Sequence, residues 1–182
     1  MLSQSRRAIG VSPEYALLGF LSQQPAHGYD LHQQLMTNLG QIWHVSLSQT
    51  YNILNRLEGQ GFISGNVQEQ TKLPDRRRFR LKAAGRRRFE SWMHSTAGCS
   101  VHAIRIEFAT RLYFARAMSI DKASGAVEAQ IADTQNCVRR LQQMLEDIPP
   151  EQVFNRLGVE LRIRQLTSAI RWIRDFANAI GA

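Results

Sequence analysis

The chain has 182 residues, of which 43% are hydrophobic and 21% charged, values that exclude wholesale disorder and leave room for one sizeable domain or two small ones. Its formal net charge of +8 favours a polyanionic partner. The charge is uneven, because residues 1–98 carry 12 Lys and Arg against 6 Asp and Glu, whereas residues 99–182 carry 11 against 9. We therefore expect the anionic partner to bind the N-terminal half.

Neither an export signal nor a membrane anchor is evident. The N-terminal Met1–Arg7 lacks a following apolar core, and no apolar run approaches membrane-spanning length. Cys99 and Cys137 belong to no Cys-x-x-Cys or His–Cys cluster, so we expect two packing thiols and no metal or other cofactor. These features predict a cytoplasmic protein without a membrane partner.

The N-terminal half is predicted to begin with two helices. Residues 1–11 are polar and basic, and we expect them to form a loose arm. Ser12-Pro13 offers a capping hydroxyl and then a proline at the first helical position, which starts a helix with a nearly unbroken apolar run from Tyr15 to Leu21. A break at 23–28 separates it from an amphipathic helix at Tyr29–Leu39.

The next predicted helix has two contrasting faces. Either Ser46 or Ser48 can cap its start, and Gly59 and Gly61 can stop it. Its inner face holds Leu47, Thr50, Ile53, Leu54 and Leu57. Its outer face holds amides, hydroxyls and one guanidinium, at Ser48, Gln49, Asn52, Asn55 and Arg56, with Tyr51 at the border. Asn and Gln pair with adenine edges and Arg with guanine edges, so this face suits a helix that reads the DNA major groove; an ordinary solvated face is the alternative.

Two short strands are predicted after this helix. Phe62-Ile63 begins the first, and the alternation of Arg78-Phe79-Arg80-Leu81 indicates the second, with a polar tip at Gly65–Pro74 between them. Three helices followed by two such strands form a winged helix-turn-helix. The cations expected to hold backbone phosphates are Lys72, Arg76, Arg77 and Arg78. A solvated basic patch is the alternative.

The C-terminal half is predicted to contain helices only. After a basic helix that includes Arg86–Met93, the small, polar segment 95–100 is expected to separate a DNA-binding domain, residues 12–95, from a helical domain, residues 101–182. One long helix carries an apolar seam at alternating spacings of four and three, and a second follows Pro149-Pro150. Two such stripes favour pairing with a second copy, and an intrachain hairpin is the alternative.

The expected dimer interface combines the stripes of both long helices. Phe154, Trp172 and Phe176 lie beside the stripe of the second helix. The residues expected to form the interface are Val127, Ile131, Val138, Leu141, Leu145, Ile163, Leu166, Ile170 and Ile173.

Taken together, several short motifs resemble the PadR-type transcriptional regulators. They are Leu18-Gly-Phe-Leu21, Pro25-Ala-His-Gly-Tyr-Asp-Leu31, Trp43, Tyr51, Leu54-Asn-Arg-Leu-Glu58, Gly61-Phe-Ile63, Asp75-Arg-Arg-Arg-Phe-Arg-Leu81 and Gly85. The C-terminal half is similar to the helical dimerisation region of a longer branch that includes virulence-gene activators. Leu47-Ser48 and Asn52 stand where Pro-Gly and Pro are frequent in the family, which indicates a different operator. The resemblance also implies that a small molecule such as a phenolic acid is a possible effector.

The sequence therefore predicts a mainly α fold, in which a winged helix-turn-helix domain with a two-stranded β-wing precedes an all-helical dimerisation domain. The predicted function is a homodimeric, sequence-specific regulator, either repressor or activator, that binds a palindromic operator in double-stranded DNA. The alternative is a winged-helix module for protein interaction or assembly that does not bind DNA. No constellation of catalytic side chains appears at usable spacing, so an enzyme is not expected.

Overall fold

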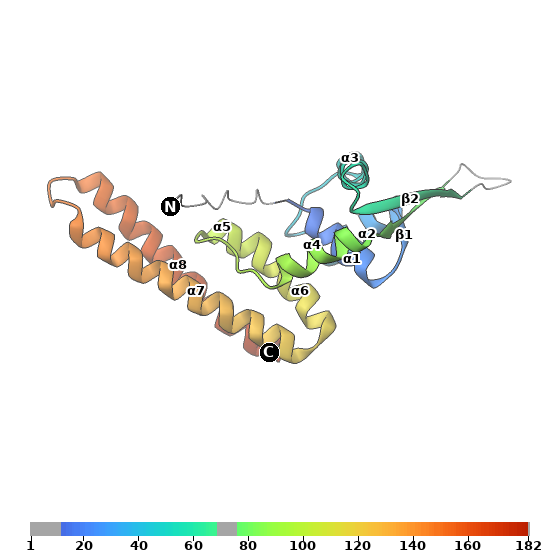
Figure 1. The fold of residues 1–182 in the computed structure, drawn as a ribbon. Coiled ribbons are helices and arrows are strands. Elements are labelled where there is room, and N and C mark those ends of the chain that lie inside the picture. The colour runs from blue at the N-terminus through green and yellow to red at the C-terminus, as the bar shows by residue number, and fades with distance from the viewer. Residues whose placement is uncertain (1–11, 69–75, 182) are drawn as a thin grey trace, which may run out of the picture. The chain divides into compact units, whose positions relative to one another are not determined.

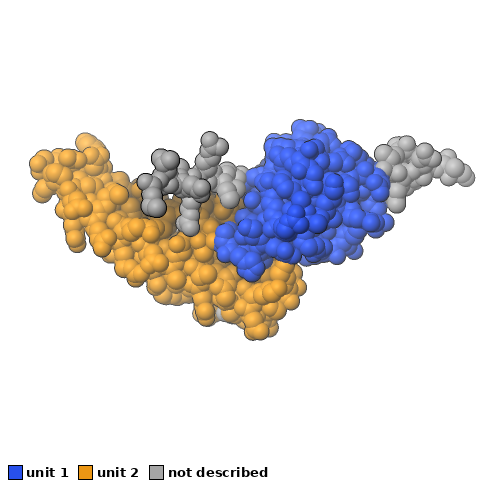
Figure 2. All heavy atoms as spheres, in the orientation of Figure 1, with its two compact units in different colours: residues 1–95 blue, residues 96–182 orange. Residues whose placement is uncertain are grey.

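A computed structural model describes residues 12–68 and 76–181. The chain divides into two compact units, residues 1–95 and residues 96–182 (Figure 2). The predicted N-terminal arm, residues 1–11, and Lys72 of the wing lie outside the described residues. Over the described part of the chain, no helix has the length and apolar character needed to cross a membrane. Within the same residues, no group of three His, Cys, Asp or Glu side chains is placed to hold a metal ion.

The N-terminal unit has the predicted order of helices and wing strands (Figure 1). Its elements are α1 (Glu14–Gln23), β1 (Ala26–His27), α2 (Gly28–Leu39), α3 (Leu47–Gly59), β2 (Ile63–Gln68), β3 (Arg76–Leu81) and α4 (Ala83–Met93). The fold class is thereby confirmed, with one difference in the sheet. Strand β1 pairs antiparallel with β3, so the sheet has three strands in the order β1-β3-β2. A strand of two residues is too short to produce an alternating pattern in the sequence.

Helix α1 forms the centre of this unit. Every residue from Glu14 to Leu21 is buried, which explains why its apolar run is nearly unbroken. The helix packs against α2, α3, α4 and β3. The Tyr15 ring stacks on the Trp92 ring of α4, with centroids 4.7 Å apart. Because α1 contacts an element on every side, it fixes the positions of α3 and the wing.

All the regular elements in the described part of the C-terminal unit are helices. Its elements are α5 (Val101–Ala103), the π-helical turn η1 (Ile104–Phe108), α6 (Ala109–Met118), α7 (Ile120–Asp147) and α8 (Val153–Ile180). The side chains of Ser100 and Ser119 accept hydrogen bonds from Ala103 N and Lys122 N, which caps α5 and α7. Helices α7 and α8 lie side by side as an antiparallel hairpin (Figure 1).

The hairpin changes the interpretation of the apolar stripes. The buried face of α7 consists of Ala123, Val127, Gln130, Thr134, Cys137 and Leu141, so its register is shifted from the predicted seam. Ile131, Val138 and Leu145 of α7, and Ile163 of α8, are only partly buried. The shift arises because α7 packs against α6 as well as α8. Gln130 and Thr134 are also buried because they form hydrogen bonds inside the unit.

Five of the residues predicted for the dimer interface are covered within the single chain by this packing. They are Val127, Leu141, Leu166, Ile170 and Ile173, each no more than 7% exposed within the single chain. A regular apolar stripe does not distinguish a partner helix of the same chain from one of a second copy. In this structure the intrachain alternative accounts for these residues.

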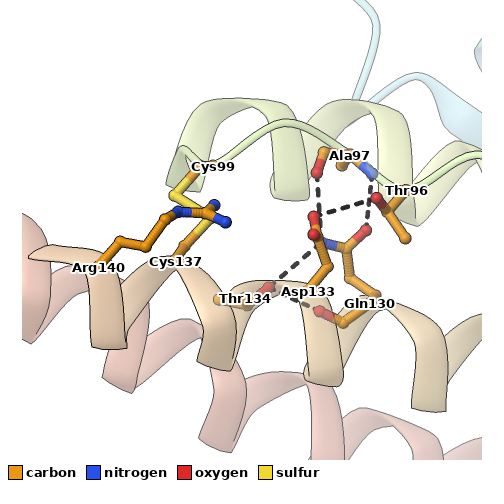
Figure 3. The surroundings of a disulfide bond; sticks show 8 residues. All are labelled: Thr96, Ala97, Cys99, Gln130, Asp133, Thr134, Cys137 and Arg140. Atoms are coloured by element: carbon orange, nitrogen blue, oxygen red, sulfur yellow. Dashed lines mark hydrogen bonds between the residues drawn. A yellow bond between two sulfur atoms is a disulfide. The ribbon is translucent and has the colours of Figure 1, made fainter.

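The expectation that the two cysteines are packing thiols was wrong. Cys99 and Cys137 are joined by a disulfide, with Cα atoms 6.1 Å apart (Figure 3). Segment 96–100 lies against α7, which brings together two residues separated by 38 positions in the chain. Sequence spacing alone did not indicate this contact.

Candidate nucleic-acid interface

Helix α3 begins with a capping box. The Ser46 side chain accepts a hydrogen bond from Gln49 N (3.2 Å), and Gln49 Oε1 accepts one from Ser46 N (2.8 Å). Ser46 is therefore the cap rather than Ser48, and the Gln49 amide oxygen is used to hold the helix start. At the other end, Gly61 adopts a positive φ of 77°, a conformation that glycine reaches without strain.

The inner face of α3 fixes the helix to α1 and α2. Thr50, Ile53, Leu54 and Leu57 are buried as predicted. Leu47 was predicted to join them but is 38% exposed, since it lies in the first turn, ahead of the buried stretch. The Thr50 hydroxyl donates to Ser46 O (3.1 Å) and lies 3.0 Å from His32 Nδ1 of α2. A hydrogen bond behind the exposed face therefore joins α3 to its neighbour.

The outer face of α3 presents the polar side chains that the sequence predicted. The exposed residues are Ser48, Gln49, Tyr51, Asn52, Asn55 and Arg56. Of the side chains that the structure describes, none forms a hydrogen bond or ion pair with Ser48 or Asn52. These two residues therefore keep their donors and acceptors for an external partner.

Arg56 is held by the N-terminal helix. Its Nη2 atom lies 2.5 Å from Glu14 Oε1, and Arg88 of α4 reaches the other oxygen of the same carboxylate at 3.0 Å. The Glu14 side chain is only 9% exposed, whereas that of Arg56 is 52% exposed. The Arg88 guanidinium also lies over the Phe62 ring, 4.6 Å from its centroid. This network joins α1, α3 and α4 at one buried carboxylate.

The wing is attached to the end of α3 through Glu58. Arg77 Nη2 of β3 donates to Glu58 Oε2 at 2.5 Å, and Arg77 Nη1 donates to Asn55 Oδ1 at 3.3 Å. The other Glu58 oxygen accepts from Gly65 N of β2 at 2.7 Å. A Cβ atom at Gly65 would lie 2.7 Å from Arg77 Nε, so a side chain at this position would displace the arginine from this arrangement. One carboxylate thus holds both wing strands.

Arg78 lies in a different environment from Arg77. Arg78 is exposed and lies on β3 opposite Asn66 and His27. Neighbouring side chains of a strand point to opposite faces of the sheet, so Arg78 lies on the other face from Arg77. Arg76 has its backbone in β3, opposite Gln68. Arg77 and Arg78, predicted as equivalent phosphate ligands, therefore lie in different environments.

Tyr51 packs closely over the start of α2. A Cβ atom added to Gly28 would lie 2.6 Å from Tyr51 Cε1 and 3.0 Å from its hydroxyl oxygen. The tyrosine is 36% exposed, which agrees with its predicted place at the border of the two faces. Its position depends on the absence of a side chain at Gly28.

Two functionally placed residues were missed from the sequence, Glu14 and Glu58. Each is an isolated carboxylate whose partners are distant along the chain, Glu14 and Arg88 by 74 positions and Glu58 and Arg77 by 19. A signal for Glu58 was present in the sequence. It is an acid next to an outer face that otherwise holds amides, hydroxyls and one guanidinium, which indicates that it pairs with a cation of the protein.

Both halves of the chain are similar to known transcriptional regulators. Residues 17–91 match the model of the transcriptional regulator PadR-like family, and residues 104–180 match that of the virulence activator alpha C-terminal region. The negative transcriptional regulator PadR of Bacillus subtilis (strain 168) is 27% identical over 135 residues, which cover 74% of either chain.

Solved structures similar to this chain include two of Bacillus subtilis PadR. Its complex with operator DNA has 23% identity and a TM-score of 0.46, over 92% of this chain and 98% of that one. Its complex with p-coumaric acid has 22% identity and a TM-score of 0.41, over 93% and 96%.

Proposed function

The chain belongs to the PadR-type transcriptional regulators, and we propose that it binds a specific operator in double-stranded DNA through α3 and the wing, as a homodimer. Regulators of this family are DNA-binding transcription factors rather than enzymes, in agreement with the prediction from the sequence. The matched names include a negative regulator and a virulence activator. The proposal therefore concerns operator binding and leaves the sign of regulation open.

The exposed face of α3 carries this proposal. Ser48 and Asn52 are exposed and make no bond to any described side chain. An Asn side chain offers a donor and an acceptor to the edge of an adenine in the major groove. Helix α3, which carries both residues, is held in place by the ion pair between Arg56 and the buried Glu14 and by the contact between Thr50 and His32. A helix that is anchored in this way, and that exposes the Asn52 amide and the Ser48 hydroxyl, supports base recognition.

The geometry favours different roles for the four arginines. Arg56 and Arg77 hold α3 to α1 and to the wing through their ion pairs. We assign them a positioning role, although both keep exposed edges that can approach DNA. Arg78 is exposed, and it forms no hydrogen bond or ion pair with the side chains that the structure describes, so it is assigned to backbone phosphate. Lys72 and Arg76 keep the phosphate role predicted from the sequence, and Tyr51 is assigned to phosphate through its hydroxyl.

A second apolar face of α8 supports the homodimer. One face of this helix is covered by α7 and includes Leu166 and Ile173. Outside that face, α8 exposes Val153, Phe154, Leu157, Leu161, Trp172 and Phe176, with Phe154 88% exposed. At 3.6 residues per turn, Phe154, Leu161 and Trp172 point in directions within about 20° of each other. Monomeric proteins rarely expose such a stripe, and a second copy supplies the same apolar chemistry to cover it.

The remaining parts of the proposal follow from operator binding. A regulator of this kind acts where the DNA is, so the proposed location is the cytoplasm. A two-fold dimer predicts a palindromic operator with half-sites about one helical turn (~34 Å), or a multiple of it, apart. A small-molecule effector stays a prediction from the family resemblance.

The test is selection of bound sequences from a random DNA pool with the purified full chain, followed by affinity measurements against salt. The proposal predicts an enriched palindrome and a linear fall of log affinity with log salt concentration. Enrichment of no sequence, together with no binding to DNA at low salt, would refute it and favour the protein-interaction alternative.

A further inference from the structure

The first residues of the C-terminal unit are fixed along one face of α7 (Figure 3). Thr96 Oγ1 donates to Asp133 Oδ2 at 3.0 Å, and Ala97 N donates to Gln130 Oε1 at 2.7 Å. Two positions after Ala97, Cys99 is bonded to Cys137. Residues 130, 133 and 137 are spaced by three and four, so they lie on the same face of the helix.

The hydrogen bonds place the two sulfur atoms together without relying on the disulfide. Gln130 is buried, and its Nε2 atom donates to Ala97 O at 3.5 Å and to Thr134 Oγ1 at 3.2 Å. Its amide is thus bonded to both polar atoms of the Ala97 backbone. The Cα atoms of the cysteines, 6.1 Å apart, are within the range that disulfides span. The segment therefore aligns the two thiols in the reduced chain as well.

We propose that Cys99 and Cys137 form a reversible oxidation site for hydrogen peroxide or an alkyl hydroperoxide. This inference rests on the proposed function in one respect: a DNA-binding regulator works in a compartment where thiol reductants break persistent disulfides. A bond between well-aligned cysteines in such a protein forms on oxidation and is removed on reduction. The pair is then a sensor of oxidant rather than a permanent cross-link.

The surroundings assign a different part to each cysteine. Cys99 is partly exposed and can meet a peroxide from solution, whereas Cys137 is 2% exposed. Arg140 Nη2 lies 3.1 Å from Cys137 Sγ, and a guanidinium at this distance stabilises the negative sulfur of a thiolate. Cys99 is therefore the sulfur that reacts first, and Cys137 is the one that closes the bond.

The two steps balance without a further reagent. The Cys99 thiolate attacks one oxygen of the peroxide, the O–O bond breaks, and Cys99 sulfenic acid forms as hydroxide or an alkoxide leaves and takes a proton from solvent to become water or an alcohol. The Cys137 thiolate then attacks the Cys99 sulfur, the S–O bond breaks, and hydroxide leaves and is protonated to water. Both electrons lost by the thiol pair have reduced the peroxide. A dithiol reductant reverses the bond by thiol–disulfide exchange.

The experiment uses the full chain, fully reduced and then freed of reductant. Alkylation of the unfolded chain, followed by mass spectrometry, should find two free thiols in the sample taken before hydrogen peroxide is added and none in the sample taken afterwards, with both restored by a dithiol. Closing a loop of this length should raise the midpoint of thermal unfolding by about 10 °C on oxidation. Cys99→Ser should abolish that rise, and it leaves the buried Cys137 in place so that the fold is retained.

A pair of arginine variants tests the assignment of roles. Arg140→Gln should slow disulfide closure several-fold after Cys99 has been oxidised. Arg139→Gln, which removes the same charge at the preceding residue, should not slow it. Two thiols that remain alkylatable after peroxide, or oxidation that stops at sulfinic acid without a disulfide, would overturn the proposal. These measurements need no DNA. A chain that forms the bond but binds no operator therefore refutes the proposed function alone.

Discussion

Arg77 in the wing and Glu58 near the end of α3 are joined by an ion pair of 2.5 Å, and the same carboxylate accepts a hydrogen bond from the backbone of Gly65. The contact connects the helix proposed to read bases with the strands proposed to hold phosphates. Any rotation of the wing relative to α3 breaks this contact. Glu58 therefore sets the distance between two parts of the interface although it is itself an acid.

Glu58→Gln tests this connection. The side chains of Arg77 and Glu58 are 40% and 25% exposed, so solvent screens the pair. We expect a loss of about 0.5–1 kcal/mol in stability, and a fall of about 2–4 °C in the unfolding midpoint. Binding to the operator should weaken more than binding to random DNA, because the helix and wing lose their fixed spacing. Calorimetry and fluorescence anisotropy measure the two effects.

Glu90→Gln is the matched control, since Glu90 is an exposed carboxylate of α4. It removes the same charge at a position outside the α3–wing contact. If both variants changed affinity for operator and random DNA alike, net charge rather than positioning would explain the result.

Glu14→Gln should lower the free energy of unfolding more than Glu58→Gln does. Its carboxylate is buried and pairs with both Arg56 and Arg88, but the Arg56 side chain is 52% exposed, which lowers the penalty. We expect a loss of about 2 kcal/mol in the free energy of unfolding, measured by urea denaturation. The double variant Glu14→Gln/Arg88→Met should recover part of this loss, because no uncompensated buried cation then remains. Additive losses would show that the two residues do not interact.

The contrast between Glu14 and the α3 stripe shows what the sequence could predict. Periodicity located Ile53, Leu54 and Leu57 inside and the amides outside, because burial repeats with the helical turn. Ion pairs such as those of Glu14 have no period and depend on the packing of distant elements. The third strand and the Cys99–Cys137 bond were missed for the same reason.

The long helices show a different limit. Their apolar stripes were evident, but a stripe specifies that a face is covered and not which helix covers it. The covered face of α8 lies against α7 of the same chain, and its shorter, broken stripe at Phe154, Leu161 and Trp172 is the one left exposed. From the sequence, Phe154, Trp172 and Phe176 were placed only beside the stronger stripe, and no separate interface was predicted for them.

Phe154→Asp/Leu161→Asp tests the proposed dimer face. Both residues are exposed within the chain, so the single subunit should keep its fold. Burying these carboxylates against a second copy costs several kcal/mol, about 2 kcal/mol or more for each. We therefore expect a folded monomer by light scattering and circular dichroism. Ile173→Asp, at a fully buried position of the hairpin, should instead unfold the C-terminal unit. A variant that stays dimeric would place the interface elsewhere.

Asn52→Ala tests base reading, with Arg78→Ala as its contrast. Asn52 is exposed on α3, whereas Arg78 is exposed on the wing. Loss of a bidentate Asn contact should remove about 1–3 kcal/mol of discrimination at particular base pairs, which a saturation scan of the operator measures. In a two-fold dimer the change should appear at two symmetric positions.

Arg78→Ala should weaken binding similarly on every sequence, because phosphates carry no base identity. It should also make the plot of log affinity against log salt shallower by about one unit for each lost contact. Uniform weakening by Asn52→Ala would place α3 on the DNA backbone and assign specificity to another element. No effect of Asn52→Ala on any sequence would exclude this residue from the interface, since its side chain forms no hydrogen bond or ion pair with the described residues that could mask the loss.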